Sequence, residues 1–144
     1  MKWFVLLMLV GCEGSHAGPP TQAAEPITSG QAEAIFAGGC FWCMEGPFEK
    51  LEGVVSVESG YTGGPEIRPS YGAVAKGETG HFEAIRVVYR PDKVNYAKLL
   101  DVFWHNIDPT QSNGQFCDKG DQYRSAIFIA DASEQAQAES SKRS

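Results

Sequence analysis

Positive charge is scarce in this sequence. Its 144 residues include 12 Lys and Arg against 18 Asp and Glu, which gives a formal net charge of −6 and an isoelectric point near 5.0. No stretch combines clustered Lys or Arg with aromatic residues, so the chain lacks the basic surface with which proteins attract a phosphate backbone. We therefore expect no nucleic-acid partner.

Cysteines and long apolar runs are also few. The four cysteines stand at positions 12, 40, 43 and 117, a spacing too uneven for the disulfide framework of a small stapled fold. The apolar run 3–10 is too short to cross a bilayer as a mature helix. With 42% hydrophobic and 21% charged residues, the composition favours one globular domain with its own core.

The first thirty residues are typical of an export signal followed by a linker. The positive charge of Lys2 precedes the apolar run, and Leu9-Val10-Gly11-Cys12 resembles the lipobox of bacterial lipoproteins, in which cleavage exposes the cysteine for acylation. We predict a signal over 1–12, a flexible linker over 13–32 and a lipoprotein anchored on the extracytoplasmic side of a membrane. The alternative is a chance cysteine after a short apolar run.

Hydrophobic periodicity in the remaining chain predicts a β-α-β-β-α-β-α order. The predicted strands are 33–39, 54–61, 82–89 and 125–130, and the predicted helices are 41–51, 96–107 and 133–144, the last one polar and capped by Ser133. This order indicates an α+β fold, a two-layer α/β sandwich of ferredoxin-like topology with helices packed on a largely antiparallel sheet. We expect the domain, 33–144, to be incomplete at its C-terminus, because neither an apolar face nor a further strand follows.

Cys40 stands where the first predicted strand ends in Gly38-Gly39 and the first predicted helix begins. Backbone N–H groups and the helix dipole stabilise an anion at such a position, which favours the thiolate, the nucleophilic form of cysteine. A small buried cysteine without chemistry is the commoner case. The local pattern alone leaves both interpretations open.

Three separated blocks of the sequence resemble the A-type peptide methionine sulfoxide reductases. The blocks are Gly39-Cys40-Phe41-Trp42, Gly80-His81-Phe82-Glu83-Ala84 and Gln122-Tyr123-Arg124-Ser125-Ala126-Ile127. The stretch Gly60-Tyr61-Thr62-Gly63-Gly64 and the region of Tyr71 are similar as well. The resemblance therefore extends from residue 35 to the end of the chain.

The resemblance implies catalytic roles for four residues. Cys40 attacks the sulfoxide sulfur, Glu83 gives a proton to the sulfoxide oxygen, and Tyr71 and Tyr123 hydrogen-bond that oxygen. The roles suit the chemistry, because the oxygen gains negative charge as the sulfur is attacked. A carboxyl group in a pocket poor in water would also keep the proton that this role needs.

The resemblance further implies three substrate contacts. Phe41 and Trp42 surround the methyl group of the substrate, a role suited to flat apolar surfaces, although plain core aromatics would give the same pattern. Asp118 holds the substrate backbone or orients the site. The implied substrate is the S epimer of methionine sulfoxide, free or in oxidised proteins that the enzyme repairs, and no cofactor is implied.

Turnover leaves Cys40 as a sulfenic acid, which a second thiol normally converts to a disulfide. The candidates for this resolving thiol are Cys43, one helical turn away in a C-x-x-C pair, and Cys117, in the loop before Tyr123. Cys43 is slightly preferred. A thioredoxin-like reductant would then reduce the disulfide, and for an exported enzyme this partner would be extracytoplasmic.

Other interpretations of the same residues remain open. Cys40 and Cys43 could serve a general thiol-disulfide oxidoreductase, or form a structural disulfide in a lipoprotein that only binds partners. Together with His81 and His105 they could also bind zinc. In the zinc deaminases, however, the paired cysteines follow the H-x-E motif, whereas here they precede it, so we predict no metal.

Overall fold

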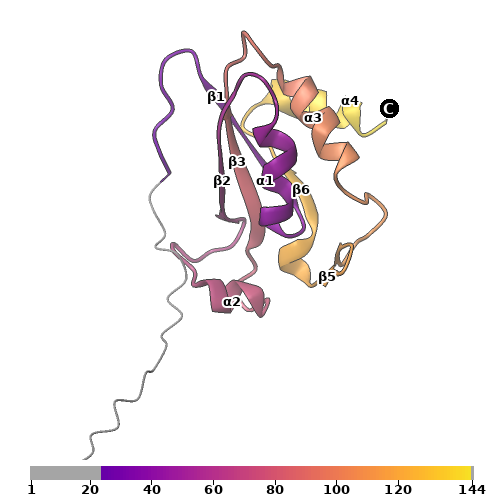
Figure 1. Cartoon of the computed structure of the whole chain (residues 1–144). Helices are drawn as coiled ribbons and strands as arrows, with labels where there is room; N and C mark the ends of the chain where they lie inside the picture. Colours follow the sequence, from indigo (N-terminus) through magenta and orange to yellow (C-terminus); the bar gives the residue numbers. More distant parts are fainter. Residues whose placement is uncertain (1–23, 144) are drawn as a thin grey trace, which may run out of the picture.

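The computed structural model describes residues 24–143 (Figure 1). The predicted signal, Cys12 and most of the predicted linker lie outside the described residues. Over residues 24–143, no helix combines the length and the apolar character needed to cross a membrane.

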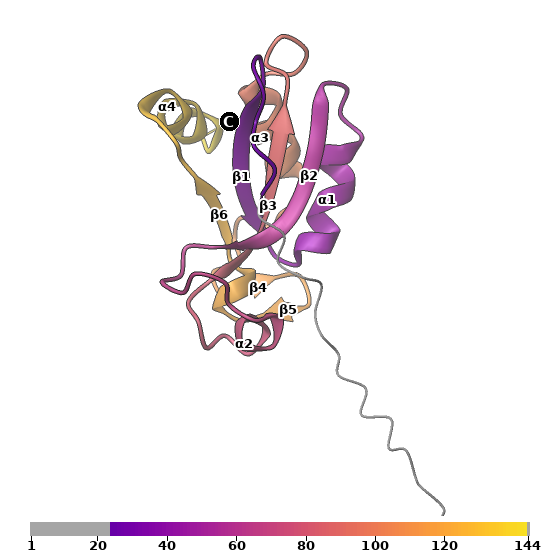
Figure 2. The same ribbon diagram turned by 90° about the vertical axis from the view of Figure 1, so that its left-hand side faces the viewer.

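A four-stranded antiparallel sheet organises the domain. It consists of β1 (Ala32–Gly38), β2 (Val54–Thr62), β3 (Phe82–Tyr89) and β6 (Ser125–Phe128), in the order β2-β3-β1-β6. Helices α1 (Phe41–Glu49) and α3 (Tyr96–His105) lie behind the sheet in Figure 2, and α4 (Ala132–Ser141) packs beside α3 at the β6 edge. The predicted two-layer, ferredoxin-like α+β fold is confirmed.

The core lies between the sheet and the two helices. Alternate residues of the central strands point into this core. Two of them are Phe36 in β1 and Ile85 in β3, which stand opposite each other in the sheet. The Phe36 ring stacks on Phe48 of α1 and on Phe103 of α3, with centroids 5.3 Å apart in both pairs. Burying each such ring contributes about 1.5–3 kcal/mol, so these contacts fix both helices on the sheet.

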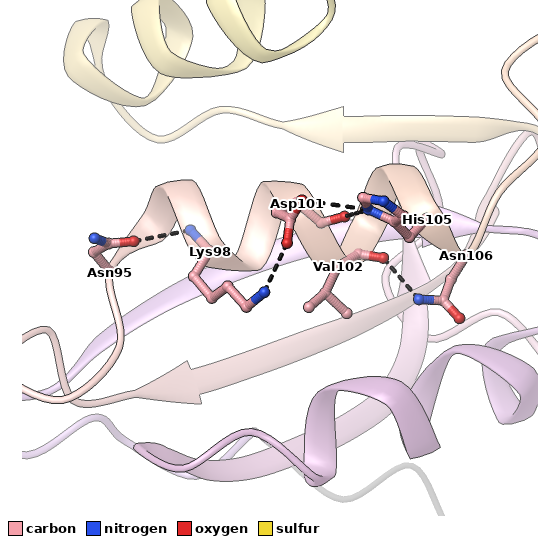
Figure 3. Close-up of polar contacts among 6 residues, drawn as sticks. All are labelled: Asn95, Lys98, Asp101, Val102, His105 and Asn106. Carbon is pink, nitrogen blue, oxygen red and sulfur yellow. Dashed lines mark hydrogen bonds and ion pairs between the residues drawn. The ribbon is translucent and has the colours of Figure 1, made fainter. Parts of the chain in front are cut away.

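Side-chain caps define the ends of α3 (Figure 3). Asn95 Oδ1 accepts a hydrogen bond of 2.8 Å from the backbone N–H of Lys98, which would otherwise be unpaired in the first turn. At the other end, Asn106 Nδ2 donates to the carbonyl of Val102 at 2.8 Å. The helix therefore ends at His105, two residues before the predicted end.

Short elements occupy two segments that lie between the predicted strands and helices. They are α2 (Tyr71–Ala75), the hairpin of β4 (Gly114–Gln115) with β5 (Asp118–Lys119), and the 3-10 turn η1 (Asp121–Tyr123). All of them lie beyond the end of the sheet at which β1 and β2 finish and β3 begins (Figures 1 and 2). This end of the sheet carries the candidate site.

The cap of α4 differs from the prediction. The N-cap residue is Asp131, whose Oδ1 accepts from the N–H of Glu134 at 2.9 Å, and Ser133 already lies inside the helix. The prediction of Ser133 as the cap was wrong because Asp131 satisfies the same kind of unpaired N–H two residues earlier. The polar character of this helix is as predicted, since Ala138 is its one buried residue.

Candidate active site

The turn from β1 into α1 positions Cys40. Gly39 has a φ of +91°, and a Cβ at this position would lie 2.7 Å from the Cβ of Gln115, so a larger residue would be both strained and obstructed. Gln115 is itself buried and holds the backbone of Asp108 by two hydrogen bonds, of 2.7 and 2.8 Å. The sharp turn makes Cys40 the N-cap residue of α1, at the end of the helix that favours negative charge.

Glu83 is a buried carboxyl group beside this turn. It lies on the core-facing side of β3, is only 2% exposed, and accepts a hydrogen bond of 3.2 Å on Oε2 from the backbone N–H of Phe41. Burial raises the pKa of Glu83; the bond from Phe41 lowers this pKa in part, and the nearby charge of Asp118 raises it further. Glu83 therefore holds its proton at a higher pH than an exposed glutamate.

Cys43 lies next to Cys40 one turn along α1. Its backbone N–H donates to the Cys40 carbonyl at 3.0 Å. Partial removal from water raises the pKa of the Cys43 thiol, and so do the charge of Cys40 and a hydrogen bond between the two side chains. Both thiols are free. The arrangement keeps a protonated thiol in contact with the candidate nucleophile.

Cys117, the other candidate for the resolving thiol, is also free but lies exposed in the turn between β4 and β5. Asp118 follows it, and the negative charge of Asp118 reaches the site, where it raises the pKa of Cys43 and of Glu83. The structure thus brings Asp118 to the site residues and places Cys43, rather than Cys117, against Cys40.

Three tyrosines lie together at the site, and two of them, Tyr61 and Tyr123, lie near Glu83. Tyr71 begins α2 and Tyr123 ends η1, while Tyr61 stands directly opposite Glu83 in the pairing of β2 with β3. Burial, followed by the charge of Glu83 and the two other phenols, raises the pKa of Tyr61 to about 12. Burial, Glu83, Tyr71 and Asp118 also raise the pKa of Tyr123. Neutral phenols near one carboxyl group are suited to donating hydrogen bonds to a developing oxyanion.

Aromatic rings form one wall of the site. Phe41 is buried, with ring centroids 5.4 Å from Trp42 and 5.7 Å from Tyr61. Trp42 is 62% exposed and stacks on Tyr71 at 6.3 Å. Such a wall, buried at Phe41 and open at Trp42, can accept a small apolar group presented from solvent.

Sequence reasoning missed two residues of the site. Tyr61 was noticed within the stretch 60–64 but received no role, because its position opposite Glu83 follows from strand register. Gln122 was part of a recognised block, but its buried amide contacts became visible only in the fold. A period-two reading of β2 and β3 together could have placed Tyr61 on the core-facing side.

The two histidines considered for zinc are used elsewhere. His81 is buried, with Nε2 lying 3.1 Å from the Glu66 carbonyl, and His105 is exposed at the end of α3, with Nδ1 at 2.7 Å from the Asp101 carbonyl (Figure 3). Throughout 24–143, the structure gathers no group of three His, Cys, Asp or Glu side chains that could hold a metal ion.

Comparisons with known proteins point to one family. A family model described as "Peptide methionine sulfoxide reductase" matches residues 32–144. Among curated proteins, the peptide methionine sulfoxide reductases MsrA of Limosilactobacillus reuteri and Streptococcus uberis are 50% identical over 110 residues and 51% identical over 109 residues. The match covers 76% of this chain in both cases and 63% and 64% of the relatives, so the chain spans less than two thirds of their length.

Solved structures agree with the sequence comparisons. The methionine sulfoxide reductase A of Corynebacterium diphtheriae aligns with a TM-score of 0.73 and 34% identity, over 81% of this chain and 55% of that one. Reduced Mxr1 of Saccharomyces cerevisiae aligns with a TM-score of 0.76 and 31% identity, over 83% of this chain and 70% of that one.

Proposed function

The chain belongs to the peptide methionine sulfoxide reductase family, and on that basis we propose that it reduces methionine sulfoxide to methionine with Cys40 as the nucleophile. The observation that carries the proposal is the meeting of a free thiol at a helix N-terminus with a buried, proton-retaining carboxyl group. The backbone N–H of Phe41, the residue after Cys40, holds that carboxyl group in place.

The proposed reaction uses both groups in one step. The Cys40 thiolate attacks the sulfoxide sulfur and forms an S–S bond while Glu83 gives its proton to the oxygen. The S–S bond and the substrate S–O bond then break as the hydroxyl moves to Cys40, which leaves a sulfenic acid and methionine. Methionine sulfur is reduced by two electrons, and Cys40 sulfur is oxidised by two. Tyr71 and Tyr123 stabilise the oxygen by hydrogen bonds while it carries negative charge.

Substrate selection is assigned to the aromatic wall and the phenols. The substrate methyl group would lie against Phe41 and Trp42, while the phenols fix the position of the oxygen. A pocket that holds methyl and oxygen in fixed places distinguishes the two epimers at sulfur. We assign the S epimer because the chain belongs to the MsrA family. The open position of Trp42 leaves room for a polypeptide as well as for the free amino acid, so protein repair is included in the proposal.

Cys43 is the proposed resolving thiol. Its contact with Cys40 allows its sulfur to attack the sulfenic acid, forming the Cys40–Cys43 disulfide and releasing water. A thioredoxin-like dithiol would then reduce the disulfide and become oxidised in its place. The exposure of Cys43 on α1 supports this exchange, because the reductant needs access to one of the two sulfurs.

A single turnover without reductant tests both assignments. Residues 24–144 are mixed with S-methionine sulfoxide, methionine is quantified, and peptide mass mapping locates the oxidised cysteines. We expect about one methionine per chain, none with Cys40→Ser, and a Cys40–Cys43 disulfide that Cys117→Ser leaves intact. No methionine from a chain shown to be folded by circular dichroism would refute the reductase; a Cys40–Cys117 disulfide would refute the resolving role of Cys43.

The contact between Cys40 and Cys43 also fits a general thiol-disulfide oxidoreductase. That activity needs no acid at position 83, so it should survive Glu83→Gln, whereas sulfoxide reduction should fall. Insulin disulfide reduction measured beside methionine formation in the two chains separates the candidates. Disulfide reduction that exceeds sulfoxide reduction in the wild type would favour the second function.

We further propose that Cys12 carries a lipid anchor and that the protein is a bacterial lipoprotein on the extracytoplasmic side of a membrane. The order of an apolar run, a small residue and a cysteine at 3–12 supports this proposal. Mass spectrometry of the N-terminal peptide after bacterial expression of the full chain should find Cys12 at the new terminus, carrying a diacylglyceryl group. An unmodified Cys12 in an uncleaved chain would refute the anchor.

A further inference from the structure

Gln122 joins the two segments that carry the candidate oxygen-binding tyrosines. It is 4% exposed and lies in η1, directly before Tyr123. Its Nε2 donates a hydrogen bond of 2.8 Å to the carbonyl of Ala75, the last residue of α2, and Tyr71 is the first residue of that helix. One buried amide therefore ties the helix of Tyr71 to the turn of Tyr123, across 47 residues of sequence.

The Gln122 amide also acts on the Tyr123 phenol and lowers its pKa, against the larger upward effects of burial, Glu83, Tyr71 and Asp118. The net shift is upward, so the Tyr123 phenol keeps a proton that it can donate. A sulfoxide oxygen, which has no proton to give, is a suitable acceptor.

The orientation of the Gln122 amide is fixed. Reversing the amide would turn its oxygen toward the Ala75 carbonyl, two acceptors facing each other, so the NH2 group has to point there. Oε1 is buried and finds no hydrogen-bond partner within the described residues. It packs against Gly120, at a φ of +130°, where a Cβ would collide with it. The buried side chain thus donates to Ala75 and, within the described residues, leaves its acceptor unpaired, which costs stability.

We propose that Gln122 is a positioning residue of the sulfoxide site: it holds the Tyr71 helix at a fixed distance from the turn of Tyr123, so that the Tyr71 hydroxyl reaches the substrate oxygen. The inference rests on the proposed function, in which both phenols bind that oxygen. It extends that function by assigning the geometry of the two donors to a residue that itself touches no reacting atom.

Gln122→Met tests the inference, because methionine keeps the length and burial of the side chain but has no N–H donor. The rate of a saturated single turnover is measured in Gln122→Met, Tyr71→Phe and the double variant, with Gln137→Met in α4 as the matched control. If Gln122 acts through the Tyr71 hydroxyl, we expect a loss of about tenfold in the first variant and less than about twofold when position 71 is already Phe. An equal loss in both backgrounds would overturn the inference, since a purely structural role does not depend on the hydroxyl group.

A second measurement needs no activity. Incorporated 3-fluorotyrosine reports the surroundings of each ring by fluorine NMR, and Tyr71→Phe identifies the signal of Tyr71. Gln122→Met should shift or broaden that signal, because the bond that holds α2 to η1 is lost; an unchanged signal would overturn the inference even in an active enzyme. A folded wild type that reduces no sulfoxide would instead overturn the proposed function, and the fluorine spectrum would still decide whether Gln122 holds the Tyr71 helix.

Discussion

Helices α1 and α4 lie on the same domain but contribute differently to it. The nine residues of α1 bury Phe41, Met44 and Phe48 against the sheet, whereas the ten residues of α4 bury Ala138 alone. Apolar burial is the main stabilising contribution to a packed helix. Of these two helices, the candidate site is therefore built on the one that the core holds more firmly.

A groove and an unpaired strand edge lie beside α4. A groove of about 610 Å³ lies between α3, α4 and β6, lined in part by Trp104, Ile127 and Ile129. None of the candidate site residues lines it. Within residues 24–143, β6 pairs with β1 and leaves its other edge open. The groove and the open strand edge thus lie on the α4 side of the domain, apart from the candidate site residues.

Removal of the nucleophile should give the largest effect on the α1 side. Cys40→Ser is expected to lower the single-turnover rate by more than about a thousandfold, since a neutral hydroxyl is a far weaker nucleophile than a thiolate. Methionine formation measures the rate. Glu139→Gln, on α4, is the comparison and should stay within about twofold. A comparable loss in the α4 variant would contradict the assignment of the chemistry to the α1 side.

Truncating one buried side chain on each helix compares how firmly α1 and α4 are packed. Phe48 is fully buried, and Phe48→Ala should cost about 3–5 kcal/mol of unfolding free energy through lost burial and a cavity. Ala138→Gly on α4 should cost about 1 kcal/mol, mainly through helix propensity. Urea unfolding measures both. Equal losses would show that α4 is held as firmly as α1.

Glu83→Gln should reduce turnover by about a hundredfold by removing the proton donor. Wild-type turnover should also fall as pH rises through the elevated pKa of Glu83, and the variant should lack this decline. The measurement is the single-turnover rate against pH. A pH-dependent decline that is identical in both chains would exclude Glu83 as its origin.

The same variant makes a prediction for stability. Because the pKa of Glu83 is raised on folding, the folded chain binds this proton more tightly than the unfolded chain does. Wild-type stability is therefore favoured below the unfolded pKa of about 4.3 and declines as pH rises through the folded pKa. Urea unfolding at pH 4 and pH 7 should show a larger loss in the wild type than in Glu83→Gln.

Ser141→Ala should give the smallest effect. Ser141 Oγ accepts a hydrogen bond of 2.8 Å from Trp104 Nε1, which links α4 to α3. Loss of this half-buried bond should cost about 1 kcal/mol and leave turnover unchanged. Thermal unfolding and methionine formation measure the two quantities. A clear loss of turnover would show that the α4 side influences the site.

The length of each element explains which parts of the fold could be predicted from the sequence. The four strands of the sheet and three helices have apolar periods long enough to detect, so their order and the ferredoxin-like topology followed. The elements α2, β4, β5 and η1 have two to five residues each, too few to show a period. They were missed for that reason, although they carry Tyr71, Asp118 and Tyr123.

Recognised blocks supplied the candidate residues but not their contacts. The C-x-x-C spacing predicted that Cys43 lies one helical turn from Cys40, but the position of Cys117 depends on how the β4–β5 hairpin is placed, which no local pattern encodes. The partners of Glu83 and Gln122 are backbone groups, at Phe41 and Ala75. Every residue has such groups, so the sequence gives no sign of which ones will be used.

The bond from the Phe41 N–H to Glu83 has a consequence for how such a site can change over generations. A main-chain donor is present with any residue except proline at position 41, so other substitutions there keep the bond that holds the acid beside the nucleophile. The exposed Trp42 can vary in size and shape without disturbing the core in which Phe41 is buried. Descendants of this protein can therefore accept new sulfoxides by changing the open part of the aromatic wall while they inherit the proton donor.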